Sequence, residues 1–85
     1  MASYNVLIKP SATKELEAIP KKDRVRVVAK IRGLAENPRP VGCEKLSGRE
    51  EYRLRQGRYR IVYSISDDDR TVLLFKIAHR REAYR

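Results

Sequence analysis

The spacing of apolar residues predicts one strand and two helices in the first half of the chain. Apolar and polar side chains alternate over Tyr4–Ile8, which is the period of a strand with one buried face. In the next two segments apolar residues recur every three or four positions, as in an amphipathic helix. This spacing predicts a short helix over about Ser11–Ala18 and a longer one that opens at Lys21 and ends at Asn37-Pro38.

The second half predicts strands joined by turns. A brief strand over Cys43–Leu46 precedes a hairpin over Glu51–Ile65. The turn Asp67–Arg70 then leads to a last strand, Thr71–His79, which begins apolar on both faces like a central strand covered by helices. The predicted order is β-α-α-β-β-β-β, an α+β fold with two helices packed on one face of a small sheet.

The hairpin concentrates arginine. A loop at Gln56-Gly57 would place glycine where φ must be positive. In that register the facing pairs are Arg55 with Arg58 and Arg53 with Arg60. Because side chains alternate along a strand, these four arginines would share one face, and the other face would be the core. The core-facing residues would be Tyr52, Leu54, Tyr59, Ile61, Tyr63 and Ile65.

Four arginines on one face of a hairpin destabilise the sheet, because their charges repel each other. Like charges directly opposite each other cost up to ~1 kcal/mol per pair in a sheet. No acid lies between Tyr52 and Ser66 to relieve the repulsion. Since arginine binds phosphate oxygens bidentately, the pattern favours a face that binds a polyanion.

Length and charge narrow the possible partners. The 85 residues suffice for a single domain, 1–85, with a modest core. Its 20 basic and 11 acidic residues give a net charge of +9, which suits nucleic acid or an acidic protein. No apolar run is long enough to span a bilayer, so no membrane association is expected. A lone Cys43 fits a reducing, cytoplasmic location.

The composition also narrows the chemistry. One histidine, one cysteine and scattered acids offer no metal cluster, and phosphate-cradling glycine motifs are absent, so neither a metal nor a cofactor is expected. The arginines suit stabilising the charged transition state of RNA cleavage. In the last strand, one face would consist of Leu73, Phe75 and Ile77. If that face is the core face, Lys76 and Arg80 lie on the opposite face with the hairpin arginines.

RNA cleavage also needs a base for the 2′-hydroxyl and an acid for the departing 5′-oxygen. Arginine is a poor proton carrier because its pKa exceeds ~12. Tyr84 is a candidate because neighbouring Arg80 and Arg81 could lower its pKa. His79 is another, since its pKa needs no such shift. The sequence does not rank three further candidates, Lys45, Glu44 and Glu82.

Several short motifs occur together in a specific order and spacing. They are Tyr4-x-Val6, Ala12-x-Lys14-x-Leu16, Leu34-Ala-Glu-Asn-Pro-Arg-Pro40, Lys45-Leu46-Ser-Gly48, Tyr52-Arg-Leu-Arg55, Gly57-x-Tyr59-Arg-Ile-Val-Tyr63 and His79-Arg-Arg-Glu-Ala-Tyr84. With them the chain resembles the RelE/ParE toxin superfamily over nearly its whole length, and specifically the RelE-like branch. The resemblance implies a RelE-like fold, a small mixed sheet with two helices on one face. It also implies cleavage of messenger RNA in the ribosomal A site, and a hetero-oligomeric complex with a RelB-like antitoxin.

The resemblance also implies roles for particular residues. Carried over by position, the catalytic residues are Arg53, Arg55, Arg60, Arg80 and Tyr84. The predicted contacts to RNA or the ribosome are Arg58, Lys76 and Arg81. Ribosome-dependent relatives often carry lysines where Arg53 and Arg55 stand, which shifts the acid–base role toward Tyr84 or His79.

Two other functions stay open on the same residues. One is a ParE-like inhibitor of DNA gyrase that has no nuclease activity. The other is a plain nucleic-acid-binding module, for which more exposed aromatic residues would be expected. The basic strand face favours the nuclease, because an inhibitor that acts only on protein has no need of a phosphate site.

Overall fold

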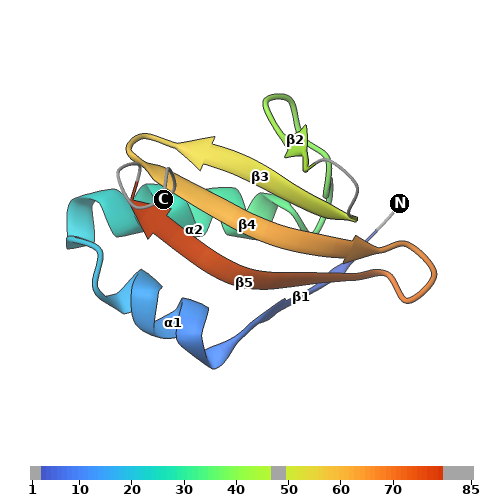
Figure 1. Ribbon diagram of the computed structural model, residues 1–85, viewed down its shortest axis with the longest axis horizontal. Helices are drawn as coiled ribbons and strands as arrows, with labels where there is room; N and C mark the ends of the chain where they lie inside the picture. The colour runs from blue at the N-terminus through green and yellow to red at the C-terminus, as the bar shows by residue number, and fades with distance from the viewer. Residues whose placement is uncertain (1–2, 47–49, 80–85) are drawn as a thin grey trace.

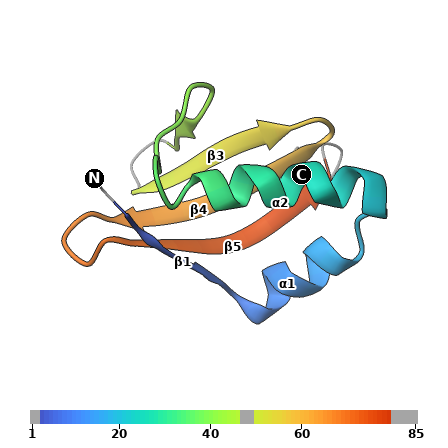
Figure 2. The ribbon, with the colours of Figure 1, turned by 180° about the vertical axis from the view of Figure 1, so that it is seen from behind.

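A twisted sheet with both helices on one face forms the described part of the chain, residues 3–46 and 50–79 of a computed structural model (Figure 1). The elements in chain order are β1 (Asn5–Ile8), α1 (Pro10–Glu17), α2 (Lys21–Gly33), β2 (Glu44–Lys45), β3 (Glu51–Gln56), β4 (Tyr59–Ser66) and β5 (Thr71–His79). Seen from behind, α2 crosses the sheet and α1 lies beside the lower edge of β5 (Figure 2). This order matches the predicted β-α-α-β-β-β-β.

The sheet is mixed. Its strands lie in the order β1-β5-β4-β3-β2, with β1 parallel to β5 and every other pair antiparallel. β1 and β5 pair although they are far apart in the sequence. The predicted α+β class, with a mostly antiparallel sheet and helices on one face, is confirmed.

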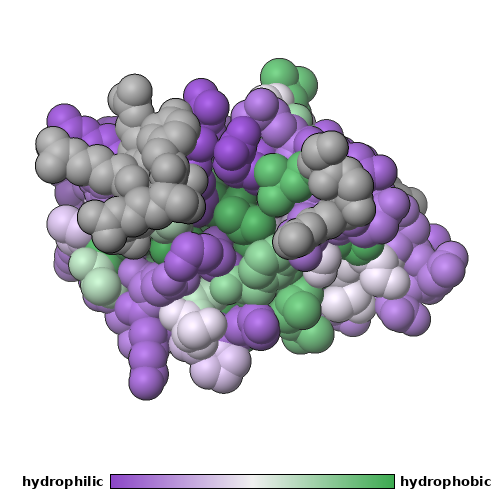
Figure 3. Space-filling model, viewed as in Figure 1, coloured by the Kyte–Doolittle hydropathy of each residue, from purple (hydrophilic) through white to green (hydrophobic). Residues whose placement is uncertain are grey.

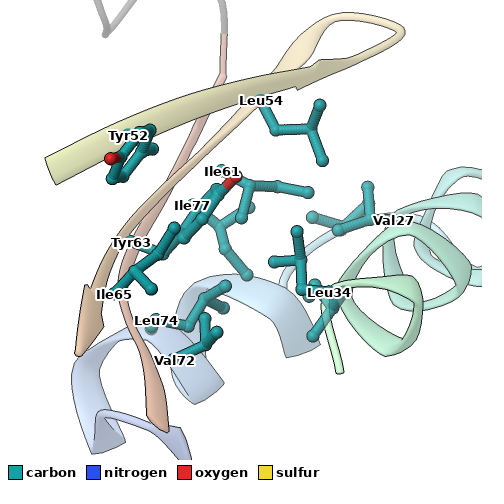
Figure 4. Close-up of a cluster of buried hydrophobic side chains, with 13 residues drawn as sticks. Val27, Leu34, Tyr52, Leu54, Ile61, Tyr63, Ile65, Val72, Leu74 and Ile77 are labelled. Atoms are coloured by element: carbon teal, nitrogen blue, oxygen red, sulfur yellow. The ribbon is translucent and has the colours of Figure 1, made fainter. Parts of the chain in front are cut away.

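The core lies between the sheet and the helices (Figure 4). Its helical side comes from buried residues of both helices and the residues after them: Ala12, Ile19, Val27, Ile31 and Leu34. Its sheet side comes from Tyr52, Leu54, Ile61, Tyr63, Ile65, Val72, Leu74 and Ile77. The alternation along the hairpin thus identified the core face correctly, with Tyr59 half-buried at its edge.

The hairpin loop lies one residue further along than predicted. Arg55 pairs with Arg60 and Gln56 with Tyr59, so the two loop residues are Gly57 and Arg58. Gly57 has a φ of +60° and is the first of them, where a type II′ turn requires glycine. The prediction had placed glycine second in the loop. Its register is therefore wrong, and Arg58 does not face Arg55.

The last strand changes face part-way. Tyr63 pairs with Leu74 and Val62 with Lys76, which leaves Phe75 as an extra residue, as in a β-bulge. Val72 and Leu74 therefore face the core before the bulge, and Ile77 faces it afterwards. The prediction that Leu73, Phe75 and Ile77 share the core face is wrong for the first two, which are half-buried.

Candidate functional site

The sheet face away from the helices carries three of the predicted arginines. Arg55 and Arg60 are direct partners on β3 and β4, and Arg53 lies two residues before Arg55 on the same face, opposite Val62. We call this surface the arginine face. Figure 3 views the molecule from this side and shows hydrophilic residues around an apolar centre.

Burial differs sharply among the three side chains. Arg55 is exposed, and Arg53 keeps 28% of its side-chain surface in contact with solvent. Arg60 is only 3% exposed, although it points away from the helices. The three arginines of this face are therefore not equally accessible to a ligand. Arg60 is nearly fully covered, and Arg53 and Arg55 are the side chains of this face that solvent reaches.

A carboxylate comes to this face from another strand. Glu44 on β2 pairs in register with Arg53. Its Oε1 lies 3.4 Å from an Arg53 Nη2 and 3.9 Å from an Arg55 Nη2. The hairpin has no acid between Tyr52 and Ser66, but the folded sheet relieves the repulsion between the arginines through Glu44.

The Arg53 guanidinium is only partly satisfied by this contact. Its Nε is buried and finds no acceptor among the described residues. A buried donor without an acceptor costs about 1–3 kcal/mol, so an anion that reached Nε would recover this cost on binding. The Arg53 guanidinium therefore keeps one donor that the described part of the protein leaves unused.

Lys76 shares the sheet face of the arginines, as predicted, because it pairs with Val62, the partner of Arg53, but its ammonium group binds α1 instead of a neighbour on that face. Its Nζ lies 3.1 Å from a Glu15 carboxylate oxygen on α1, and the other oxygen of Glu15 accepts the Ile77 backbone N–H at 2.9 Å. β1 pairs with β5 only as far as Leu74, so Glu15 satisfies the edge of β5 beyond that point. Lys76 thus takes part in fixing α1 to this edge.

Two of the predicted proton carriers lie on the other side of the sheet. His79 pairs in register with Tyr59, and their rings meet edge to face at 5.4 Å. Both border a cavity of about 290 Å³ between the end of β5 and α1. Lys45 pairs with the core-facing Tyr52, and its Nζ lies 3.4 Å from Glu50. Neither residue shares the arginine face.

Arg58 is also apart from the arginine face. It stands in the hairpin loop and borders a cavity of about 350 Å³ that α2 closes with Asp23 and Arg26. The remaining predicted site residues, Arg80, Arg81 and Tyr84, lie outside the described residues. Within the described ranges, 3–46 and 50–79, no group of three or more metal-ligating side chains is present, and no helix is long and apolar enough to cross a membrane.

Known proteins are similar to this chain in both fold and sequence. Residues 6–84 match the model of a family described as the ParE toxin of the type II toxin–antitoxin system parDE. The chain belongs to this family.

Two of its similar relatives are named as RelE toxins. Toxin RelE of Mycobacterium tuberculosis is 33% identical over 84 residues, which cover 96% of this chain and 87% of that protein. Among solved structures, the archaeal RelE–RelB complex from Pyrococcus horikoshii superposes with a TM-score of 0.84 at 30% identity, covering 92% of this chain and 96% of the other. The RelBE2 toxin–antitoxin complex of Mycobacterium tuberculosis gives 0.82 at 28%, covering 94% of each.

The predicted membership of the RelE/ParE superfamily, in its RelE-like branch, is confirmed by these matches. The protein is a toxin of a type II toxin–antitoxin system. Its site includes one residue that sequence reasoning left unranked, Glu44. The signal that could have singled it out is the pairing of a short strand at 43–46 with the start of the hairpin, which puts an acid beside Arg53.

Proposed function

We propose that this RelE-family toxin is an endoribonuclease that cleaves messenger RNA in the ribosomal A site and so stops translation in the cytoplasm. The observation that carries the proposal is the arrangement of Arg53 and Arg55 around Glu44 on an open sheet face. Two guanidinium groups that both approach one carboxylate oxygen, at 3.4 and 3.9 Å, suit the non-bridging oxygens of one phosphate. Their charge would stabilise the additional negative charge that develops as the phosphate becomes pentavalent.

The same charge suits a ribosome-dependent enzyme. With a net charge of +9, the toxin is drawn to any RNA surface, and the ribosome would supply both the message and its orientation. Arg58 stands in the hairpin loop and the Lys76 ammonium is held by Glu15 at the edge of β5, so both would contact RNA away from the scissile phosphate. Arg80, Arg81 and Tyr84 are proposed to complete the site from the sequence resemblance alone.

We also propose a RelB-like antitoxin as the cognate partner, in a toxin–antitoxin hetero-oligomer. The support is that the solved complexes from Pyrococcus horikoshii and Mycobacterium tuberculosis each pair such a toxin with its antitoxin. An acidic segment of the antitoxin would neutralise the excess basic charge of the toxin.

The test is translation of a reporter message in a purified system, with cleavage mapped by primer extension and gyrase supercoiling assayed in parallel. We expect cuts within ribosome-occupied codons and no effect on gyrase. Arg55→Ala should reduce cleavage strongly, because Arg55 is exposed on the arginine face. Arg26→Ala removes the same charge from an exposed position on α2 and serves as the matched control. Gyrase inhibition without cleavage would overturn the proposal.

A further inference from the structure

Glu44 occupies a position that its strand pairing determines. β2 is only two residues long and lies at the edge of the sheet, where Glu44 pairs with Arg53. The pairing directs its carboxylate onto the arginine face, with about half of its side-chain surface exposed. One oxygen, Oε1, meets both guanidinium groups, and the carboxylate stays open to a ligand from solution.

Other proton-accepting groups are less well placed among the described residues. His79 and Lys45 lie toward the opposite side of the sheet, and arginine does not give up its proton at ordinary pH. Glu51 shares the arginine face, but it stands one row further along β3, opposite Ser64. Glu44 is the carboxylate that sits between the two arginines.

We infer that Glu44 is the general base that removes the proton from the attacking 2′-hydroxyl. The inference rests on the proposed nuclease function and adds a catalytic residue to it. A phosphate bound by Arg53 and Arg55 would lie beside Glu44, since the carboxylate contacts both guanidinium groups. The 2′-oxygen of the preceding ribose is four bonds from that phosphorus, so its proton would come within reach of the carboxylate.

The step balances without a metal or a redox partner. The 2′-O–H proton moves to the Glu44 carboxylate while the 2′-oxygen forms a bond to phosphorus and the bond from phosphorus to the 5′-oxygen breaks. The departing oxygen takes a proton from a general acid or from water. The products are a 2′,3′-cyclic phosphate and a 5′-hydroxyl, and Glu44 returns its proton to solvent before the next cycle.

Binding would also rearrange the ion pairs. The phosphate competes with Glu44 for the two arginines and offers an acceptor to the buried Arg53 Nε. Glu44 therefore loses part of its contact with the guanidinium groups as the substrate arrives. Removing its charge should leave RNA binding unchanged or make it tighter, even though the chemical step slows.

The test is single-turnover cleavage on programmed ribosomes, with ribosome affinity measured separately. We expect Glu44→Gln, which keeps the shape of the side chain, to lower the saturating cleavage rate by about 10²- to 10⁴-fold. The affinity should be equal or higher. We expect the acidic limb that a carboxylate base gives a pH–rate profile in the wild type and its absence in Glu44→Gln, while Glu44→Asp should retain part of the cleavage rate. Glu51→Gln is the matched control on the same face and should cleave normally.

The outcomes separate the two proposals. If the wild type cleaves and Glu44→Gln cleaves equally fast with the same pH profile, Glu44 is not the base and the nuclease function stands. If Glu51→Gln is the variant that loses the rate and the acidic limb, the assignment to Glu44 is also wrong. If the wild-type protein does not cleave at all, both the nuclease function and the role of Glu44 are wrong. Thermal melts of each variant show whether a lost rate reflects a lost fold.

Discussion

Arg39 and Asp67 form a bidentate ion pair between two loops that are far apart in the sequence. The guanidinium donates to both carboxylate oxygens, at 3.2 and 3.0 Å. Its Nε donates to the Tyr52 hydroxyl at 3.1 Å, and the guanidinium carbon lies 5.2 Å from the centre of the Tyr52 ring. Tyr4 donates to the same carboxylate at 2.8 Å. The Asn-Pro-Arg-Pro motif therefore fixes the loop before β2 to the turn between β4 and β5.

This network makes the fold sensitive to acid. Hydrogen bonds from Arg39 and Tyr4 hold the pKa of Asp67 below its ordinary value. A carboxyl group with a lowered folded-state pKa contributes stability above its unfolded pKa, about 3.9, and loses it as the pH falls through the folded value. We expect Asp67→Asn to destabilise the protein at neutral pH and to flatten the loss of stability below about pH 4.

Urea unfolding between pH 2 and 7 measures this effect. Asp68→Asn, one residue along the same turn, removes an equal charge without the Arg39 contact and is the control. Identical pH dependence in the wild type and Asp67→Asn would show that the ion pair adds nothing to stability.

Arg60→Ala should destabilise the domain, contrary to what the sequence pattern suggests. On the pattern alone, removing one of several facing arginines would relieve repulsion at no cost. Arg60 is nearly fully buried, however, and a buried charged group is held by hydrogen bonds that alanine does not replace. We expect the free energy of unfolding to fall by about 1–3 kcal/mol.

The control for Arg60→Ala is the same substitution at Arg55, the exposed residue that pairs with Arg60. Arg55→Ala should change the free energy of unfolding by less than about 0.5 kcal/mol, as at other surface sites. Equal stability of the two variants in denaturant titrations would mean that the buried guanidinium contributes no net stability. Activity of Arg60→Ala must therefore be compared at equal folded fraction.

Two glycines offer a matched test of backbone conformation. A Cβ added at Gly57 or at Gly33 would meet nothing within 4 Å, so packing does not distinguish them. Gly57 has a φ of +60°, which costs a residue with a side chain about 1–2 kcal/mol. Gly33 closes α2, where alanine is favoured over glycine by up to about 1 kcal/mol.

Gly57→Ala should therefore lower the melting temperature, and Gly33→Ala should raise it slightly. Thermal unfolding of both variants beside the wild type measures the difference. A Gly57→Ala protein as stable as the wild type would show that the hairpin turn relaxes away from positive φ.

Association with the proposed antitoxin should depend strongly on salt. The toxin carries +9, and attraction between opposite charges is screened over about 8 Å at physiological ionic strength. We expect the association rate to fall markedly as salt rises, while the dissociation rate changes less. Stopped-flow or surface-based kinetics from 50 to 500 mM salt would measure it. An association rate that ignores salt would show that charge does not steer the encounter.

The sequence by itself determined the elements and their faces. Two-residue alternation along the hairpin depends only on neighbouring residues, so it placed Tyr52, Leu54 and Ile61 in the core correctly. The order of helices and strands followed from the same local periods, and the family followed from motifs that lie in one chain order.

The tertiary structure decided which residues pair across the strands and on which face of the sheet each side chain lies. One extra residue at Phe75 reverses the faces of the last strand, and a one-residue change in loop position alters every partner in the hairpin. Because strand pairing joins segments that are distant in sequence, it alone brings Glu44 between Arg53 and Arg55 and leaves His79 on the other side of the sheet. Burial of Arg60 likewise arises from what packs around it, which periodicity along one strand does not encode.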